Sequence, residues 1–182
     1  MRRLRIVLGI RNEELMMKST RKLVFMGLFI SLEIILTRVV GLMPTNITRI
    51  SLSFVVYTFS GLMFGPWFTA IMAFFSDIVG AMLFPPIGGF FIGFSISALV
   101  SGFLFGLISK DYKRIFLVLL LNLLIVEIGM NTFWLKIITH TPFWALLIKR
   151  IPGIMTNVLI RVVVLIPLLK KFEVSLLNES GY

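Results

Sequence analysis

A succession of apolar stretches, each long enough to cross a lipid bilayer, dominates this sequence of 182 residues. A transmembrane helix needs roughly 18 to 20 consecutive, mostly apolar residues, and five or six stretches reach that length. Hydrophobic residues make up 58% of the chain, and its mean hydropathy is +1.03. The strands of a transmembrane barrel would alternate in apolarity, and residues 115–126 do not. The sequence therefore predicts an all-α integral membrane protein.

Proline and glycine divide the apolar sequence into six predicted transmembrane helices. Gly65 and Pro66 separate the second from the third, and the prolines and glycines of residues 85–89 end the third, because proline cannot continue a helix. The predicted spans are residues 23–40, 50–64, 67–84, 90–108, 115–135 and 149–169. Residues 23–169 thus form one predicted transmembrane domain, between a basic N-terminal segment, residues 1–22, and a C-terminal tail, residues 170–182.

The distribution of basic residues predicts that both termini are cytoplasmic, because short cytoplasmic loops accumulate Lys and Arg. In that orientation the inner segments carry Arg2, Arg3, Arg5, Arg11, Lys18, Arg21, Lys22, Lys110, Lys113, Arg114, Lys170 and Lys171. The net charge of +10 is then explained by topology and by contact with anionic lipid. We expect no nucleic-acid binding, because no soluble domain is predicted that would carry a binding face.

Several classes of chemistry are excluded by composition. The chain has no cysteine and one histidine, His140, so a thiol nucleophile, a thiolate site and a multi-histidine metal site are all ruled out. No Gly-rich loop ending in Gly-Lys-Ser/Thr is present, and no Gly-x-Ser-x-Gly segment. We therefore expect neither an enzyme nor an ATPase, and no cofactor or metal.

Four basic residues fall on or near the predicted outer side, where the charge rule disfavours them: Arg49, Lys136, Lys149 and Arg150. Their position suggests that an anionic ligand is held there.

Five charged residues lie within predicted spans: Glu33, Arg38, Asp77, Glu127 and Arg161. An ionised group at the centre of a bilayer costs on the order of 3 kcal/mol, so each needs a partner or a function. Helical spacing places Arg161 on one face with Arg150 and Asn157, and Glu127 on one face with Asn131 and Trp134. These faces either line a ligand cavity or pair with each other, with Glu127 bonded to Arg161. Asp77 serves either structural hydrogen bonding or a ligand ring with N–H groups.

Two further patterns allow two interpretations each. Tyr57, Phe90, Trp134 and Trp144 lie near outer ends or loops, where they act as interface anchors or as a platform for a flat ligand. Gly27 and Ser31 form a small-xxx-small pair in the first span, which suits close contact with another helix of this chain or of a partner protein.

Four segments, in this order, resemble the substrate-binding component of energy-coupling factor vitamin importers of the folate type. They are Arg49-Ile-Ser-Leu-Ser-Phe-Val-Val-Tyr57, Phe84-Pro-Pro-Ile-Gly-Gly-Phe-Phe-Ile-Gly-Phe94, Asn131-Thr-Phe-Trp-Leu135 and Arg150-Ile-Pro152. The resemblance extends over residues 18–171. It implies a six-helix protein of the bacterial plasma membrane that captures a vitamin outside. It also implies a complex with a transmembrane coupling component and two ATP-binding-cassette ATPases, with Gly27 and Ser31 at the coupling interface.

Folate combines a pterin ring, a benzoyl group and a glutamate, so it needs aromatic contacts, hydrogen bonds and cations. We expect Arg49 and Arg150, assisted by Lys136, to bind its carboxylates. The rings of Tyr57, Phe90 and Trp134 would sandwich the ligand, Asp77 and Asn131 would accept hydrogen bonds from the pterin, and Gly88 would belong to a gate at residues 85–89. Two alternatives stay open: a binding component of the same kind for another vitamin or a nucleobase, and a membrane scaffold subunit that transports nothing.

Overall fold

The computed structural model describes residues 19–39, 52–85, 89–108 and 112–179, and all regular structure in these ranges is helical. The first helix, α2 (Ser19–Ile34), continues into the π-helical turn η1 (Ile35–Val39). Next come α3 (Ser53–Phe64), α4 (Pro66–Leu83) and α5 (Ile92–Gly106). A single rod then consists of α6 (Tyr112–Leu121), the π-helix η2 (Asn122–Met130) and α7 (Asn131–Thr139), and α8 (Phe143–Glu179) closes the bundle.

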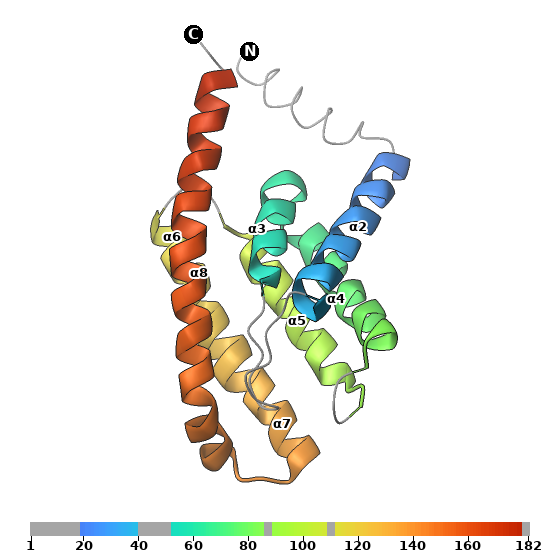
Figure 1. Ribbon diagram of the computed structural model, residues 1–182, viewed down its shortest axis with the longest axis vertical. Coiled ribbons are helices and arrows are strands. Elements are labelled where there is room, and N and C mark those ends of the chain that lie inside the picture. The colour runs from blue at the N-terminus through green and yellow to red at the C-terminus, as the bar shows by residue number, and fades with distance from the viewer. Residues whose placement is uncertain (1–18, 40–51, 86–88, 109–111, 180–182) are drawn as a thin grey trace, which may run out of the picture.

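The helices form an elongated bundle whose successive rods run in alternating directions (Figure 1). The start of α2 and the end of α8 lie at the same end of this bundle. Two helices in the described part of the chain are long and apolar enough to span a membrane, Pro66–Leu83 and Lys113–Thr139, and α3 and α5 are shorter apolar helices. Each of the six predicted spans corresponds to one rod.

The helix ends differ from the predicted ones chiefly in α8. This helix begins at Phe143, before the predicted start at Lys149, and it continues to Glu179, past Lys170 and Lys171. Lysine is a good helix former, so the two lysines mark the end of the apolar stretch without ending the helix. Pro152 and Pro167 lie inside α8, where each removes one backbone hydrogen bond of the helix.

Small residues bring α3, α4 and α5 into close contact. A Cβ atom on Gly61 would lie 2.5 Å from the Cα atom of Gly106. One on Gly102 would lie 2.7 Å from both the Ala73 Cβ and the Thr69 carbonyl oxygen. Backbones approach this closely only where side chains are minimal, which is the usual way for helices to associate in a membrane. These three helices form the tightly packed centre of the bundle.

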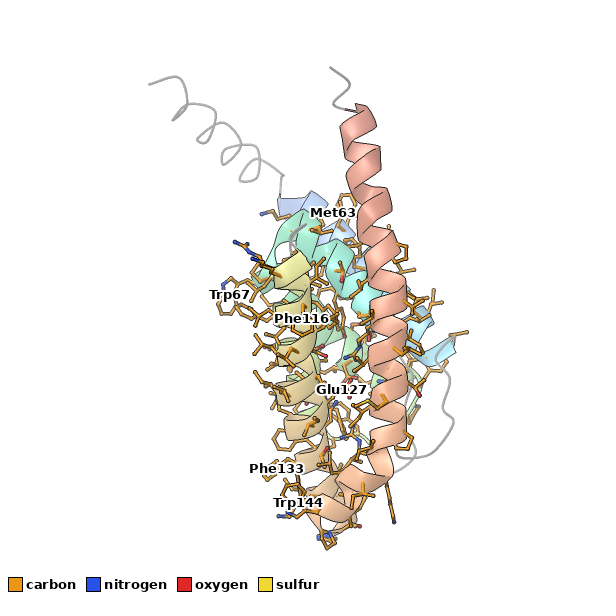
Figure 2. All side chains as sticks on the ribbon, turned by 90° about the vertical axis from the view of Figure 1, so that its left-hand side faces the viewer. Met63, Trp67, Phe116, Glu127, Phe133 and Trp144 are labelled. Atoms are coloured by element: carbon orange, nitrogen blue, oxygen red, sulfur yellow. The ribbon has the colours of Figure 1, made fainter. Side chains whose placement is uncertain are left out.

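The outside of the bundle is apolar, and much of its polarity is inside. Large exposed side chains include Met63, Trp67, Phe116, Phe133 and Trp144, which Figure 2 shows projecting outward along its length. Trp67 and Trp144 lie toward opposite ends, as expected of aromatic anchors at the two membrane surfaces. Such a distribution suits a surface that faces lipid.

We expect Gly102→Ala to lower the thermal stability of the purified protein in detergent. The added methyl group would meet a backbone oxygen and two alanines of α4, and overpacking of this kind costs about 1–3 kcal/mol. Gly27→Ala is the matched control, because no atom lies within 4 Å of the position of its Cβ. Equal melting temperatures for the two variants would show that the helices can separate at no cost.

Candidate functional site

Charged side chains in the interior gather in two clusters. The α2–α4 cluster consists of Glu33, Arg38, Tyr57, Ser76, Asp77 and Ser95. The α8 cluster consists of Asn122, Glu127, Thr132, Arg150 and Arg161. Each cluster joins helices that are distant in sequence, so charged residues of one helix form ion pairs with charged residues of another.

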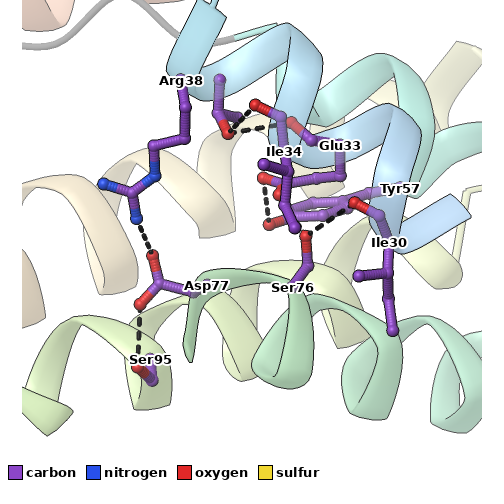
Figure 3. A network of polar contacts seen from close by, with 9 residues as sticks. Ile30, Glu33, Ile34, Arg38, Tyr57, Ser76, Asp77 and Ser95 are labelled. Atoms are coloured by element: carbon purple, nitrogen blue, oxygen red, sulfur yellow. Dashed lines mark hydrogen bonds and ion pairs between the residues drawn. The ribbon is translucent and has the colours of Figure 1, made fainter. Parts of the chain in front are cut away.

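In the α2–α4 cluster, Asp77 links three helices (Figure 3). Its Oδ1 atom lies 3.1 Å from Nη2 of Arg38 on η1, and its Oδ2 atom accepts a hydrogen bond of 2.8 Å from Ser95 on α5. Gly80 makes room for this ion pair, because a Cβ atom there would lie 3.2 Å from the Arg38 Nε. Of the two roles foreseen for Asp77, the structure shows the structural one.

The second carboxylate of this cluster, Glu33, is bonded to α3 and α4. Ser76 donates a hydrogen bond to its Oε2 atom, and the Tyr57 hydroxyl donates to its Oε1 atom over 3.4 Å. Tyr57 is only 4% exposed and packs against Phe105. Its ring therefore lies in the hydrophobic core, and its hydroxyl is already occupied.

In the α8 cluster, one carboxylate lies between two guanidinium groups. Glu127 Oε1 is 2.6 Å from Nη2 of Arg161, so the foreseen pairing of these two residues is present. Glu127 Oε2 is 3.6 Å from Nη2 of Arg150, which also donates through Nη1 to the Glu127 carbonyl oxygen and to Thr132 Oγ1, over 2.8 and 2.5 Å. Arg161 in turn donates to Asn122 over 2.8 Å. Glu127 lies about midway along the bundle in Figure 2.

The π-helical winding of η2 shapes this cluster. The backbone N–H of Asn131 bonds to the carbonyl of Val126, five residues earlier, and π-helical turns of this kind are frequent at functional sites. The Glu127 carbonyl accepts the hydrogen bonds of Arg150 and of the Thr132 hydroxyl. The wide turn thus presents both the side chain and the carbonyl of Glu127 to α8.

The α8 cluster has more positive charge than negative. With Glu127, Arg150 and Arg161 ionised, its net charge is one positive unit. The Nε atoms of both arginines, and Oδ1 of the nearby Asn131, are buried without a hydrogen-bond partner among the residues that the structure describes. An unsatisfied buried polar atom costs about 1–3 kcal/mol. The two Nε–H groups therefore favour an anionic ligand, and the Asn131 oxygen favours a ligand group that donates a hydrogen bond.

An aromatic group lies beside this cluster, where α7 meets α5. The indole N–H of Trp134 donates to Ser97 over 3.1 Å, and the Trp134 ring is 5.7 Å from that of Phe91. A Cβ atom on Gly93 would lie 2.6 Å from the indole, so only glycine lets Trp134 pack against α5 here. Phe91, Gly93 and Ser97 were not foreseen as site residues, although the spacing of Gly93 and Ser97 is itself small-xxx-small.

The remaining foreseen residues are dispersed. Phe90 is 51% exposed. Lys136 is exposed at the end of α7, where it lines an open hollow of about 650 Å³ together with Phe133, Ile137, His140, Thr141 and Pro142. Gly27 and Ser31 are exposed on α2, and the Ser31 hydroxyl bonds to the Gly27 carbonyl. Arg49 and Gly88 lie outside the described residues.

The structure thus defines a class of protein: a membrane-type helical bundle whose interior is cationic and holds buried polar atoms without partners among the described residues. The family described as "ECF-type riboflavin transporter, S component" matches residues 17–173, and the chain belongs to this family. Its members are membrane-embedded components of transporters, and the chain is not an enzyme.

Individual relatives carry a second vitamin in their names. A folate transporter, FolT, of Clostridium novyi (strain NT) is 34% identical over 139 residues, which cover 74% of this chain and 80% of that protein. FolT of Leuconostoc mesenteroides subsp. mesenteroides is 30% identical over 128 residues, covering 68% of each. A crystal structure of FolT bound with folic acid superimposes with a TM-score of 0.76 at 25% identity, covering 84% of this chain and 95% of that one.

We expect Arg38 and Asp77 to show strong coupling in a double-mutant cycle of stability. Arg38→Met and Asp77→Asn each leave one charge of the pair without its counter-charge in the interior, and the double variant removes both charges, so the coupling should be about 1–3 kcal/mol. A cycle of Arg38→Met with Thr156→Val, an exposed position on α8, should be additive. Additivity in both cycles would contradict the structural role of the pair.

Proposed function

We propose that this chain is the folate-binding S component of an ATP-driven ECF importer of the bacterial plasma membrane. The observation that carries this proposal is the α8 cluster, whose uncompensated positive charge and unpaired Nε atoms suit a carboxylate. The names of the two relatives, and that of the solved structure, support folate as the ligand.

Arg150 is the residue best prepared to bind a carboxylate. Its Nη1 atom is occupied by Thr132 and the Glu127 carbonyl, whereas its Nη2 atom is 3.6 Å from the Glu127 carboxylate and its Nε atom has no partner among the described residues. A guanidinium binds carboxylates best through two neighbouring N–H groups. The Nε and Nη2 edge of Arg150 therefore offers a bidentate site, which Arg49 and Lys136 would supplement.

The ring system of folate would lie against the aromatic group of α5 and α7. The indole of Trp134 offers a flat apolar face, extended by Phe91 and, at the end of the bundle, by Phe90. The unpaired Oδ1 of Asn131 accepts a hydrogen bond from a ring N–H. We also propose that Gly88 belongs to a gate at residues 85–89. Tyr57 and Asp77 are bonded within the α2–α4 cluster, and we propose that they support the site through that cluster.

Riboflavin is the second candidate ligand, because the matching family carries that name. It has a flat ring but no carboxylate. An uncharged ligand would leave the positive charge of the α8 cluster uncompensated inside the bundle, where compensation is most needed. Charge therefore favours folate over riboflavin.

The same proposal extends to partners and orientation. An S component acts with a transmembrane coupling component and two ATPases, and the exposed Gly27 and Ser31 on α2 offer the coupling component a smooth surface. The helices α2 and α6 begin at the same end of the bundle, and Lys22, Lys113 and Arg114 belong to these helix starts. This basic end supports a cytoplasmic location for both termini, with residues 23–169 as the transmembrane unit between them.

We expect folate to quench the tryptophan fluorescence of the purified protein in a saturable manner, and Arg150→Ala to weaken this binding at least tenfold. The variant removes the guanidinium that is best placed for a carboxylate. Lys149→Ala is the matched control, because it removes the same charge from the neighbouring, exposed position. Riboflavin should not compete. Tight binding of riboflavin with no response to folate would refute the ligand assignment.

We expect Gly27→Leu to abolish co-purification with the coupling component while leaving folate binding intact. The leucine side chain would fill the open surface beside Ser31. Leu28→Ala, a change at an exposed neighbour on the same helix, serves as the control. Uptake assays in cells would also test the scaffold alternative, which predicts that changes to the outer cations Arg49, Lys136, Lys149 and Arg150 alter assembly and leave uptake unaffected.

A further inference from the structure

The α8 cluster contains two arginines and one carboxylate, and this ratio bears on how much negative charge a ligand brings. Arg161 is engaged through both terminal nitrogens, with Nη2 2.6 Å from Glu127 and Nη1 2.8 Å from Asn122. The Asn122 amide donates in turn to Ser101 over 2.7 Å, so Arg161 is connected through Asn122 to α5. Among the described residues, the one carboxylate near Arg150 is that of Glu127, at the longer distance of 3.6 Å, and its two hydrogen bonds go to uncharged oxygens of Glu127 and Thr132. Glu127 thus neutralises Arg161 and leaves Arg150 largely uncompensated.

Both arginines are buried, so the uneven compensation of their charges affects ligand binding. Arg150 is 6% exposed and Arg161 is 8% exposed, so neither charge is screened by water. A ligand carboxylate bonded to Arg150 would bring the net charge of the cluster to zero. A second carboxylate would make it negative, next to the carboxylate of Glu127, and like charges at close range in a poorly screened interior repel strongly.

We infer that Glu127 is a specificity-determining residue that sets the number of ligand carboxylates the interior accepts at one. Glu127 occupies, on the protein side, the place that a second carboxylate of the ligand would take at Arg161. This inference rests on the proposed function and refines it, because folate carries two carboxylates on its glutamate. One of them binds Arg150. The other remains outside the cluster, where the exposed Lys136 offers it only a solvent-screened contact of small energy.

The test compares folate with three analogues: the two monoamides, in which the α- or the γ-carboxylate is a carboxamide, and the diamide. On the unmodified protein, one monoamide should bind within threefold of folate. The other monoamide and the diamide should bind at least tenfold more weakly, and equally. Stepwise losses over both monoamides and the diamide would overturn the inference, as would equal binding of all four compounds.

Substitution of Glu127 then tests its own role. In Glu127→Gln, which keeps the shape and a carbonyl oxygen for Arg161, the second carboxylate becomes favourable, so folate should bind at least fivefold more tightly than the better monoamide. Glu127→Asp keeps the negative charge, so folate and the better monoamide should bind this variant with nearly equal affinity, as they do the unmodified protein. Glu33→Gln, which removes one negative charge from the α2–α4 cluster, should leave the ratio as it is in the unmodified protein.

If folded Glu127→Gln shows the same ratio of folate affinity to monoamide affinity as the unmodified protein, the role of Glu127 is overturned. If this ratio rises equally in Glu33→Gln, the effect belongs to overall charge, and the role of Glu127 is overturned as well. If Glu127→Gln does not fold, the analogue series on the unmodified protein still decides the number of carboxylates. Absence of folate binding by the unmodified protein would refute the proposed function together with this inference. Folate binding with the wrong pattern of analogues would refute this inference alone.

Discussion

Charged side chains inside this bundle need their counter-charges from other helices, because hydrocarbon supplies neither water nor ions to solvate them. Arg38 depends on Asp77, and Arg161 depends on Glu127. Each pair joins a peripheral rod to the rest of the bundle, α2 with η1 in the first case and α8 in the second. Small residues pack the centre of the bundle, and buried charges fasten rods to it.

This arrangement makes the two clusters different in kind. The α2–α4 cluster has two carboxylates and one guanidinium, and a hydroxyl group contacts each carboxylate. The α8 cluster has two guanidinium groups and one carboxylate, and two of its nitrogens lack partners among the described residues. The family and its relatives are named for two vitamins of different charge, and a shared fold does not decide between them. The excess positive charge of the α8 cluster is the physical feature on which we base the proposal of folate.

The sequence predicts the helical spans well because each is a long apolar stretch bounded by charge, proline or glycine. It also foresees the Glu127–Arg161 pair, since spacing places both on polar faces of long helices. It does not foresee the pairing of Arg38 with Asp77, because a single sequence gives no sign of which distant spans touch. Nor does it foresee that Gly93 makes room for Trp134, because that requires knowing how closely α5 approaches α7. The π-helical winding of η2 likewise has no signature in its apolar residues.

Because of that winding, the number of residues between Glu127 and Trp134 determines where their side chains point. A π-helical turn advances more residues per revolution than an α-helical one, so side chains beyond η2 arrive at a different angle from those of an unbroken α-helix. Glu127 contacts α8, and Trp134, seven residues later, contacts α5. Loss of one residue from η2 would let the backbone relax into an ordinary α-helix while turning Trp134 away from Ser97. This segment should therefore vary among homologues by substitution far more readily than by insertion or deletion.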